Sequence, residues 1–337
     1  MLVILFLSAC TSRMPDCSEE QTVCIGLVAD TNGMGDMSNR SAWQALQKAH
    51  QDGLVDRIEY IETSDAQDYA KNIRTFADLG YDILVTSGFD LGNETVTAAY
   101  EYPDIFFIAV NQSVNDFTPE GGSPPQNLAG LVFPEDQAGF LAGALAALLT
   151  KSGMIGAVCA SDEINTYFRY CEGFRAGAAY IDRKVSSAIV YHNNVSLGKT
   201  TDDPEWGAAT AVSLMTQGAD IIFAVGGETG LGALQAANQF QTWAISIEAD
   251  QGFSQFDLAL QLAASVDFKL TPSLYSLIEL TVEGDFPGGG DCTGLIGYTL
   301  VQDSPIEITT EIESHLEEIL TALQDGSLET GVPLSKE

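Results

Sequence analysis

Residues 23–49 read VCIGLVADTNGMGDMSNRSAWQALQKA and contain a strand, a loop and a helix in succession. The apolar run VCIGLVA has the length and composition of a buried strand, and residues 41–53 carry apolar positions at helical spacing. Between them, Asp30 opens a loop of Gly, Asn, Ser and Asp, residue types that favour turns and helix caps. A strand that ends on a carboxylate and leads into a helix is typical of parallel α/β proteins.

The same alternation continues along the first third of the chain. Apolar strand-like runs and helical stretches follow one another, which predicts a parallel sheet covered by helices on both faces. The predicted strands are residues 24–30, 57–63, 81–88 and 104–111, and the predicted helices are residues 41–53, 66–79 and 91–100.

A loop rich in Gly and Pro, EGGSPPQN at residues 120–127, precedes a second series of the same kind. Its strands are expected at residues 128–133, 154–160, 186–192, 220–227 and 242–249. Its helices are expected at residues 135–150, 167–181, 204–217 and 230–239, with further helices at 272–282 and 311–323.

Two α/β series in one chain predict a two-lobed α/β fold, and the absence of an obvious single linker predicts that the chain crosses between lobes more than once. We expect lobe 1 to comprise residues 24–127 plus about 247–283, and lobe 2 residues 128–246 plus about 284–325. Ligands of open α/β sheets bind outside the carboxyl ends of the strands. The loops that follow strands are therefore the candidate site, in a cleft that closes by hinge motion.

The first ten residues, MLVILFLSAC, have the character of a secretory signal. Leu-Ser-Ala-Cys resembles a bacterial lipobox, which predicts lipidation of Cys10, removal of residues 1–9 and a polar tether over residues 10–23. A plain signal peptide or a buried N-terminal strand are the alternatives. The expected location is outside the cell membrane, lipid-anchored to its outer face or in the periplasm.

Charge and cysteine content narrow the class of protein. The formal net charge of −33, from 47 acidic and 14 basic residues, disfavours nucleic acid as a partner. In an exported protein cysteines favour disulfides. With Cys10 set aside for lipidation, five of the six cysteines remain, and we expect two disulfides, which leave Cys292 unpaired. No pair has zinc-ligand spacing, so no metal and no cofactor are expected. The expected pairs are Cys17 with Cys24 and Cys159 with Cys171.

Catalytic motifs are not evident. His50, His192 and His315 lie at no motif spacing from Ser, Cys or Glu, and we interpret them as surface or capping residues. The glycine-rich turn GGETGLG, which includes Gly227, either lines a ligand or only lets strand and helix pack closely. GDFPGGGDC, residues 284–292, is interpreted as a crossover or surface turn.

Polar residues at strand ends are the stronger candidates. Asp30, Asn111, Glu248 and Asp250 lie at or directly after the ends of predicted strands. Singly, each is explained by turn chemistry. Together at one edge, carboxylates and amides suit a neutral polyhydroxylated ligand, because each of these groups makes two hydrogen bonds.

From residue 24 to about 321, the chain resembles the basic membrane protein family of ABC-transporter solute-binding lipoproteins, the purine nucleoside receptors. The resemblance lies in LVADTNGMGDMSNRSAW, YDILVTSGF, YPDIFFIAVNQ, LAGLVFPEDQAGFLAGALAALLTKSGMIGAV, EGFRAGAAY, the run from DDPEW to GETGLGAL, and SIEADQ. It implies a periplasmic-binding-protein fold of the sugar-binder type, a bound nucleoside, a membrane permease as partner and no enzymatic activity. A monomer is expected.

The resemblance also implies site residues. Asp30 matches the acid after the first strand, and Ser38 and Asn39 match a Ser-Phe-Asn motif that lacks its Phe here. Phe89 is the candidate replacement for that aromatic in lobe 1, and Phe223 is the candidate in lobe 2.

The remaining matches differ from the family in residue type or position. Asn111 stands where the family has a base-binding Asp, and Glu248 where it has a ribose-binding Asp. Asp250 matches directly. Lys269 lies one position beyond the family's lysine.

Three functions remain open at this point. Capture of a nucleoside, which the resemblance implies is a purine, is the leading hypothesis. The same fold could bind a sugar or another polar metabolite for uptake or sensing, which the missing Phe favours. A nucleoside hydrolase is the alternative of a different class, but the acids are spread over separate loops.

Overall fold

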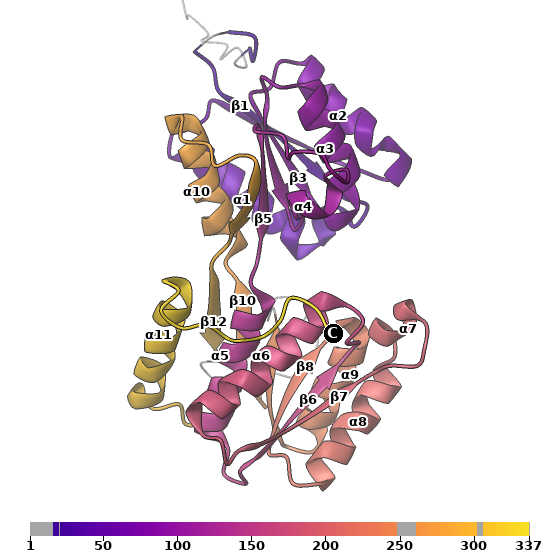
Figure 1. The fold of residues 1–337 in the computed structure, drawn as a ribbon, viewed down its shortest axis with the longest axis vertical. Helices are drawn as coiled ribbons and strands as arrows, with labels where there is room; N and C mark the ends of the chain where they lie inside the picture. The colour runs from indigo at the N-terminus through magenta and orange to yellow at the C-terminus, as the bar shows by residue number, and fades with distance from the viewer. Residues whose placement is uncertain (1–15, 20, 248–260, 302–305, 337) are drawn as a thin grey trace, which may run out of the picture. The chain divides into compact units, whose positions relative to one another are not determined.

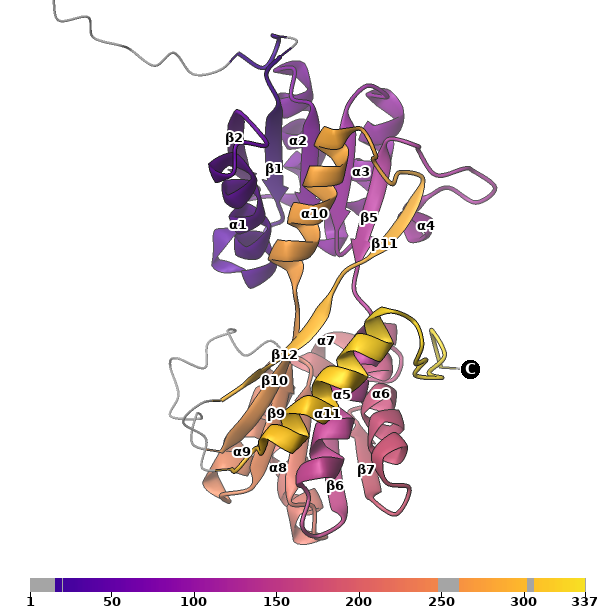
Figure 2. The ribbon, with the colours of Figure 1, turned by 90° about the vertical axis from the view of Figure 1, so that its left-hand side faces the viewer.

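The computed structural model describes residues 16–19, 21–247, 261–301 and 306–336. It divides into two compact units, Met1–Val132 with Leu270–Cys292, and Phe133–Lys269 with Thr293–Glu337 (Figures 1 and 2). Each unit contains one sheet of six strands among the described residues. The fold class predicted from the sequence, parallel α/β sheets flanked by helices, is confirmed.

Unit 1 is built on a sheet with the strand order β11-β5-β4-β3-β1-β2. The strands are β1 (Cys24–Ala29), β2 (Arg57–Glu62), β3 (Ile83–Ser87), β4 (Phe106–Val110), β5 (Leu128–Val132) and β11 (Gly290–Thr293). β1 to β5 pair in parallel. The helices are α1 (Met37–Gln51), α2 (Tyr69–Asp78), α3 (Gly92–Glu101), α4 (Val114–Phe117) and α10 (Leu270–Glu283), with 3-10 turns at Gly33–Gly35, Ala66–Asp68 and Phe89–Leu91.

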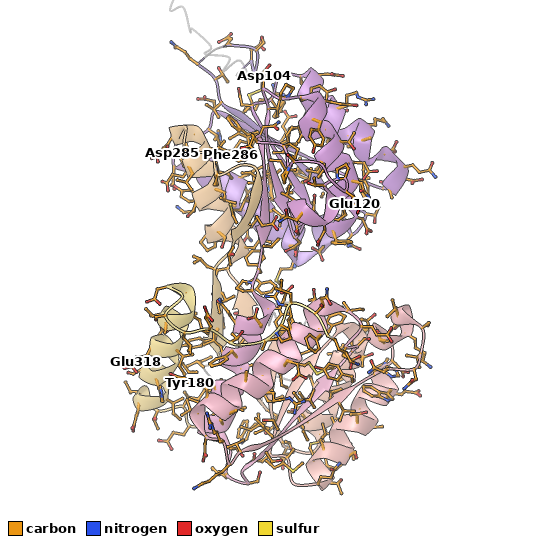
Figure 3. All side chains as sticks on the ribbon, viewed as in Figure 1. Asp104, Glu120, Tyr180, Asp285, Phe286 and Glu318 are labelled. Atoms are coloured by element: carbon orange, nitrogen blue, oxygen red, sulfur yellow. A yellow bond between two sulfur atoms is a disulfide. The ribbon has the colours of Figure 1, made fainter. Side chains whose placement is uncertain are left out.

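Figure 1 shows α1 and α10 on one face of this sheet and α2 and α3 on the other. Because both faces are covered, β1 and β3 are buried at every position, which explains their continuous apolar runs. Acidic side chains such as Asp104 and Glu120 project from the surface of the unit (Figure 3).

Unit 2 repeats the plan with the order β12-β10-β9-β8-β6-β7. Its strands are β6 (Met154–Cys159), β7 (Ser186–Tyr191), β8 (Ile221–Val225), β9 (Trp243–Ile247), β10 (Leu262–Phe268) and β12 (Ile296–Leu300), of which β12 runs antiparallel to β10. Its helices are α5 (Glu135–Leu149), α6 (Asn165–Ile181), α7 (Leu197–Thr201), α8 (Pro204–Thr216), α9 (Gly227–Gln239) and α11 (Thr310–Gln324).

Alternate residues of the central strands of unit 2 face opposite layers. On β8, Ile221, Phe223 and Val225 join the core formed with α5, α6 and α11, whereas Ile222 and Ala224 join the core formed with α8 and α9. This two-residue period is the geometry of a strand with both faces buried.

The expected lobe boundaries need correction. β5 pairs with β4 and lies in unit 1, not at the start of the second lobe. β10 pairs with β9 and lies in unit 2, although residues 247–283 were expected in lobe 1. Sequence pattern identifies a strand, but only the pairing of its backbone hydrogen bonds decides which sheet it joins. Part of the turn expected at 284–292 is likewise β11, next to β5.

Helix α1 begins at Met37, before the predicted residue 41. The Asp36 carboxylate caps it by accepting from the backbone N–H groups of Ser38 (2.8 Å) and Asn39 (3.2 Å). Ser38 and Asn39 therefore lie in the first helical turn and not in a loop.

Both expected disulfides are present. Cys17 is bonded to Cys24 in unit 1, where it ties the segment before β1 to that strand. Cys159 is bonded to Cys171 in unit 2, where it joins the end of β6 to α6. Cys292 is free.

Helices α5 and α6 touch through their backbones. A Cβ atom on Gly177 would lie 1.9 Å from the Phe140 carbonyl oxygen, and one on Gly143 would lie 1.9 Å from the Phe174 oxygen. No side chain fits at these positions, so the glycines set the distance between the two helices.

We expect Gly177→Ala to lower the free energy of unfolding by about 1–3 kcal/mol, because the added methyl forces the two helices apart. Equilibrium urea denaturation measures the loss. Gly198→Ala in α7 is the matched control, since a Cβ there meets nothing within 4 Å. Equal stability of the two variants would contradict the close packing of α5 on α6.

Candidate ligand-binding site

Asp30 lies immediately after β1, and its carboxylate organises the loop that follows. Oδ1 accepts from the Asn32 backbone N–H (3.0 Å) and from Asn39 Nδ2 (2.8 Å), and Oδ2 accepts from Asn32 Nδ2 (2.8 Å). A carboxylate has about four acceptor positions. Asp30 is only partly buried, and Oδ2 retains an acceptor position for a further donor.

Asn39 contributes in a different way from that expected. Its side chain is fully buried, and besides its hydrogen bond to Asp30, Nδ2 donates to the Gly33 carbonyl oxygen at 2.9 Å. Both amide protons are therefore used inside the protein. Asn39 orients Asp30 and holds the 3-10 turn at Gly33–Gly35, so it acts as a positioning residue.

Asn111 and Ser38 lie at the same edge of the unit 1 sheet. Asn111 directly follows β4 and has a left-handed backbone (φ 59°), which asparagine tolerates better than most residues. Its Nδ2 approaches Ser38 Oγ at 3.5 Å, and its side chain is exposed. The amide thus presents both a donor and an acceptor to solvent.

The exposed aromatic at this edge is Phe89, after β3. It is 60% exposed, and its ring centroid lies 5.0 Å from that of Phe117 in a tilted arrangement. Gly88 precedes it with φ 117°, and a Cβ on Gly88 would lie 2.6 Å from the Asp30 carboxylate. This close approach brings the start of the Phe89 turn against Asp30.

The structure therefore brings together Asp30, Ser38, Asn39, Phe89 and Asn111 at the carboxyl ends of β1, β3 and β4, which are neighbours in the sheet. These are the five expected site residues of unit 1.

Two residues that sequence reasoning missed support this edge. Gln112 is buried and donates to the Gly88 carbonyl oxygen at 2.8 Å, which fixes the turn that carries Phe89. Asp291 accepts from the Val114 N–H (2.7 Å) and the Ser113 hydroxyl (2.8 Å), which anchors the segment after Asn111. A polar residue two positions after the end of β4 was a signal for Gln112. Nothing local marks Asp291, which is 177 residues from Val114.

In unit 2 the expectation for Phe223 is wrong. Its side chain is fully buried in the middle of β8 and stacks on Phe174, with ring centroids 4.9 Å apart. Because β8 is covered on both faces, an aromatic in mid-strand belongs to the core and is not available to a ligand.

Gly227 has φ 53° and begins α9, and a Cβ there would lie 2.7 Å from the Thr201 carbonyl oxygen. The neighbouring Gly226 would place a Cβ 2.3 Å from that of Ala160. These contacts require glycine for close packing, whether or not the turn also lines a ligand.

Lys269 follows β10, and its Nζ lies 3.5 Å from Asp267 Oδ2. A Cβ on Gly297 would meet the Lys269 side chain at 2.2 Å, so the lysine stem lies flat against β12. Glu248, Asp250 and Cys10 lie outside the described residues.

His192 is buried, although the sequence was interpreted as placing it at the surface or at a helix cap. Its ring stacks on Trp206, with centroids 4.0 Å apart, and Nε2 lies 3.1 Å from Asp203 Oδ2. The hydrogen bond with His192 lowers the pKa of the Asp203 carboxyl. The described residues contain no group of three or more His, Cys, Asp or Glu arranged to hold a metal ion.

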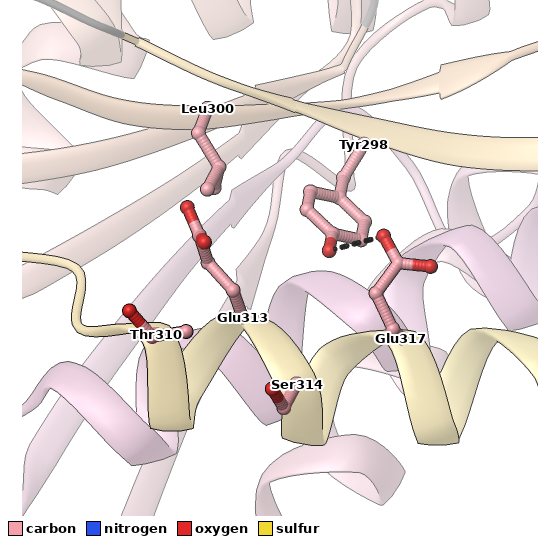
Figure 4. A pocket seen from close by; sticks show the side chains of 6 residues that line it. All are labelled: Tyr298, Leu300, Thr310, Glu313, Ser314 and Glu317. Carbon is pink, nitrogen blue, oxygen red and sulfur yellow. Dashed lines mark hydrogen bonds between the residues drawn. The ribbon is translucent and has the colours of Figure 1, made fainter.

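A hollow of about 580 Å³ lies between β12 and α11, and Figure 4 shows the side chains that line it. It is lined by Tyr298, Leu300, Thr310, Glu313, Ser314 and Glu317. The Tyr298 hydroxyl donates to Glu317 at 2.7 Å, and burial together with that carboxylate raises the pKa of Tyr298. None of these residues follows a parallel strand of the sheet.

Within the described parts of the chain, no helix is long and apolar enough to span a membrane.

Comparison with known proteins gives a family. Residues 23–297 match the family described as "ABC transporter substrate-binding protein PnrA-like". A relative in Lactococcus lactis, an "ABC transporter nucleoside-binding protein BmpA", is 25% identical over 90% of this chain and 87% of its own length.

Solved structures share the fold. An ABC transporter solute-binding protein from Conexibacter woesei superposes with a TM-score of 0.72 at 22% identity, covering 94% of this chain and all of that one. GanP, a glucose-galactose binding protein from Geobacillus stearothermophilus, superposes with a TM-score of 0.55 at 15% identity, covering 85% of this chain and all of that one. The predicted periplasmic-binding-protein fold is thereby confirmed. The chain belongs to the PnrA-like family of ABC transporter substrate-binding proteins, and it is a solute-binding protein and not an enzyme.

Proposed function

We propose that the chain captures a nucleoside at the carboxyl ends of β1, β3 and β4 and delivers it to the membrane permease of an ABC importer. The observation that carries the proposal is the partly buried Asp30 carboxylate, which retains an acceptor position while Asn32 and Asn39 fix its orientation. Such a group accepts a hydrogen bond from a ribose hydroxyl or from a base N–H.

The aromatic and amide groups of the same edge complement this acceptor. Phe89 offers an exposed ring, and stacking of a base on an aromatic side chain contributes about 1–3 kcal/mol. Asn111 both donates and accepts, so it pairs with adenine or with a pyrimidine more readily than an aspartate would. The relative from Lactococcus lactis, named as nucleoside-binding, also supports a nucleoside.

A second part of the proposal concerns the rest of the site. Glu248 would contribute the acid that binds ribose, and Lys269 a donor, as the family resemblance implies. Asp250 would be a further ligand-binding acid, because it matches the family at its own position. Lys269 would first have to exchange its contact with Asp267 for one with the ligand.

The alternative ligand is a sugar or another polar metabolite. The polar side chains of Asp30, Ser38 and Asn111 favour such a ligand. Ser38 and Asn39 are consecutive in the first turn of α1, so no aromatic side chain stands between them to stack on a base.

A melting screen of the full chain tests the proposal. Adenosine, inosine, guanosine and uridine are compared with free bases, ribose and glucose, and we expect at least one nucleoside to raise the Tm with increasing concentration, because a ligand that binds only the folded state stabilises it. Phe89→Ala should reduce the affinity by about 5- to 150-fold. Tyr100→Ala, an exposed aromatic in α3, is the control. Stabilisation by a sugar and by no nucleoside would contradict the proposal.

A matched pair of amide-to-acid changes tests how Asp30 is held. Asn39→Asp replaces the 2.8 Å hydrogen bond to Asp30 with two facing carboxylates. We expect the free energy of unfolding to fall by about 1–3 kcal/mol at neutral pH and nucleoside affinity to fall with it. Part of the loss should be recovered near pH 4, since each carboxylate raises the pKa of the other.

Urea denaturation and calorimetric titration provide the two measurements. Asn93→Asp, on the exposed first turn of α3, is the control and should remain close to wild type. A variant at residue 39 with unchanged stability and affinity would contradict the positioning role of Asn39.

We also propose that Cys10 is lipidated and tethers the receptor to the outer face of the membrane beside its permease. Cys10→Ala should abolish incorporation of a labelled fatty acid and move the protein from the membrane fraction to the soluble fraction. Cys292→Ala is the control. Unchanged labelling of the Cys10 variant would contradict the anchor.

A further inference from the structure

The loop that carries Asn111 is held by a segment of unit 1 that comes much later in the sequence. Asn111 follows β4, and the short helix α4 begins three residues later at Val114. Asp291 lies on β11, which the chain forms after it has passed through the sheet of unit 2. β11 pairs with β5 in the unit 1 sheet, and Figure 2 shows α4 beside these two strands.

Asp291 reaches this loop across β5 because the residue between them is a glycine. A Cβ on Gly130 would lie 2.5 Å from Asp291 Oδ1 and 2.5 Å from the Gln112 carbonyl oxygen. The missing side chain leaves the space through which the carboxylate passes from β11 over β5 to the end of β4. Gly130 is therefore required for Asp291 to contact the loop.

The Asp291 carboxylate binds three consecutive residues of the loop. Oδ1 accepts from the Val114 backbone N–H at 2.7 Å, and Oδ2 accepts from the Ser113 hydroxyl at 2.8 Å and from Asn115 Nδ2 at 3.3 Å. A carboxylate has about four acceptor positions, so most of this one is committed to the loop. These bonds fix the path of the chain after Gln112.

The backbone of Asn111 needs such support. Its φ of 59° is left-handed, a conformation that costs free energy in residues other than glycine and persists where the surrounding structure enforces it. On the N-terminal side, the Asn111 N–H donates to the Leu131 carbonyl oxygen at 2.9 Å. On the C-terminal side, the Gln112 side chain and then Asp291 hold the chain. The exposed Asn111 amide is thus presented by a backbone that is fixed on both sides.

We propose that Asp291 is a positioning residue of unit 1 that orients the Asn111 amide for its contact with the ligand. Asp291 itself does not touch the ligand, and it acts by holding residues 113–115, which keep Asn111 in its left-handed conformation. The inference rests on the proposed function, because it assumes that the ligand contacts Asn111. It involves groups of unit 1 alone.

A double-mutant cycle tests this role in the full chain by calorimetric titration with adenosine, inosine, guanosine, uridine, ribose and glucose. Asn111→Gly removes the amide and keeps the left-handed backbone accessible. It should weaken binding of the nucleoside that wild type binds best by about 2- to 12-fold, as expected for one hydrogen bond. Asp291→Ala should weaken binding by a similar factor, because the amide is no longer held. Adding Asn111→Gly to Asp291→Ala should then cost less than about a further twofold, since coupled residues are not additive.

Asp285→Ala is the matched control. It removes the same charge from the exposed segment shortly before β11 and should bind as wild type. Urea denaturation shows whether each variant is folded. If Asp291→Ala does not fold, the cycle is run with Asp291→Asn, which keeps an oxygen for the Val114 N–H but lacks the charge and one acceptor group.

Two independent losses that multiply in the double variant overturn the positioning role, because a merely structural effect of Asp291 would not depend on the Asn111 amide. Unchanged binding by either single variant overturns it as well. Binding of a sugar and of no nucleoside overturns the proposed function, and the same cycle with that sugar then decides the role of Asp291. A wild type that binds no member of the panel overturns both.

Discussion

Two glycines, Gly88 and Gly226, constrain how the strand ends are arranged in this protein. Gly88 follows β3, the neighbour of β1, and Gly226 follows β8, the neighbour of β6. Both glycines have positive φ, and a Cβ on either would collide with the loop that follows β1 or β6. The chain can therefore turn directly over the end of β1 or β6, which brings the next turn into contact with it. In unit 1 the contact is to Asp30, and the turn presents Phe89. In unit 2 it is to Ala160, and the buried acid of this loop is Asp162.

The scaffold around these loops is rigid for reasons unconnected with a ligand. Backbone contact between α5 and α6 and the Cys159–Cys171 disulfide fix the elements on either side of the Asp162 loop. In unit 1 the buried Gln112 and the capped start of α1 hold the turns that flank Asp30. Because these supports are satisfied internally, the exposed groups Phe89 and Asn111 are free to engage a ligand.

Much of the architecture could be predicted from local pattern. Alternating apolar runs and helical stretches gave the parallel α/β units, since a strand covered on both faces has a recognisable composition. Local pattern also places Asp30 and Asn111 at strand ends, whereas Ser38, Asn39 and Phe89 were singled out by the family resemblance, and their role in binding stays a prediction. The two disulfides, Cys17–Cys24 and Cys159–Cys171, could also be predicted, because the cysteines of each pair are close in sequence.

The rest depends on tertiary pairing. Which sheet β5 and β10 join is decided by hydrogen bonds to strands elsewhere in the chain. Phe223 was misassigned because a mid-strand aromatic and one at a strand end look alike in sequence. The contact between Asp291 and Val114, which are 177 residues apart, carries no local signal at all.

The central claim is that the carboxylate after β1 binds the ligand. A crystal structure of the protein with the nucleoside that stabilises it tests this claim most directly. The account predicts a ligand oxygen or nitrogen within hydrogen-bond distance of Asp30 Oδ2 and a base lying against the Phe89 ring. A nucleoside bound elsewhere, with Asp30 contacting only Asn32 and Asn39, would contradict it.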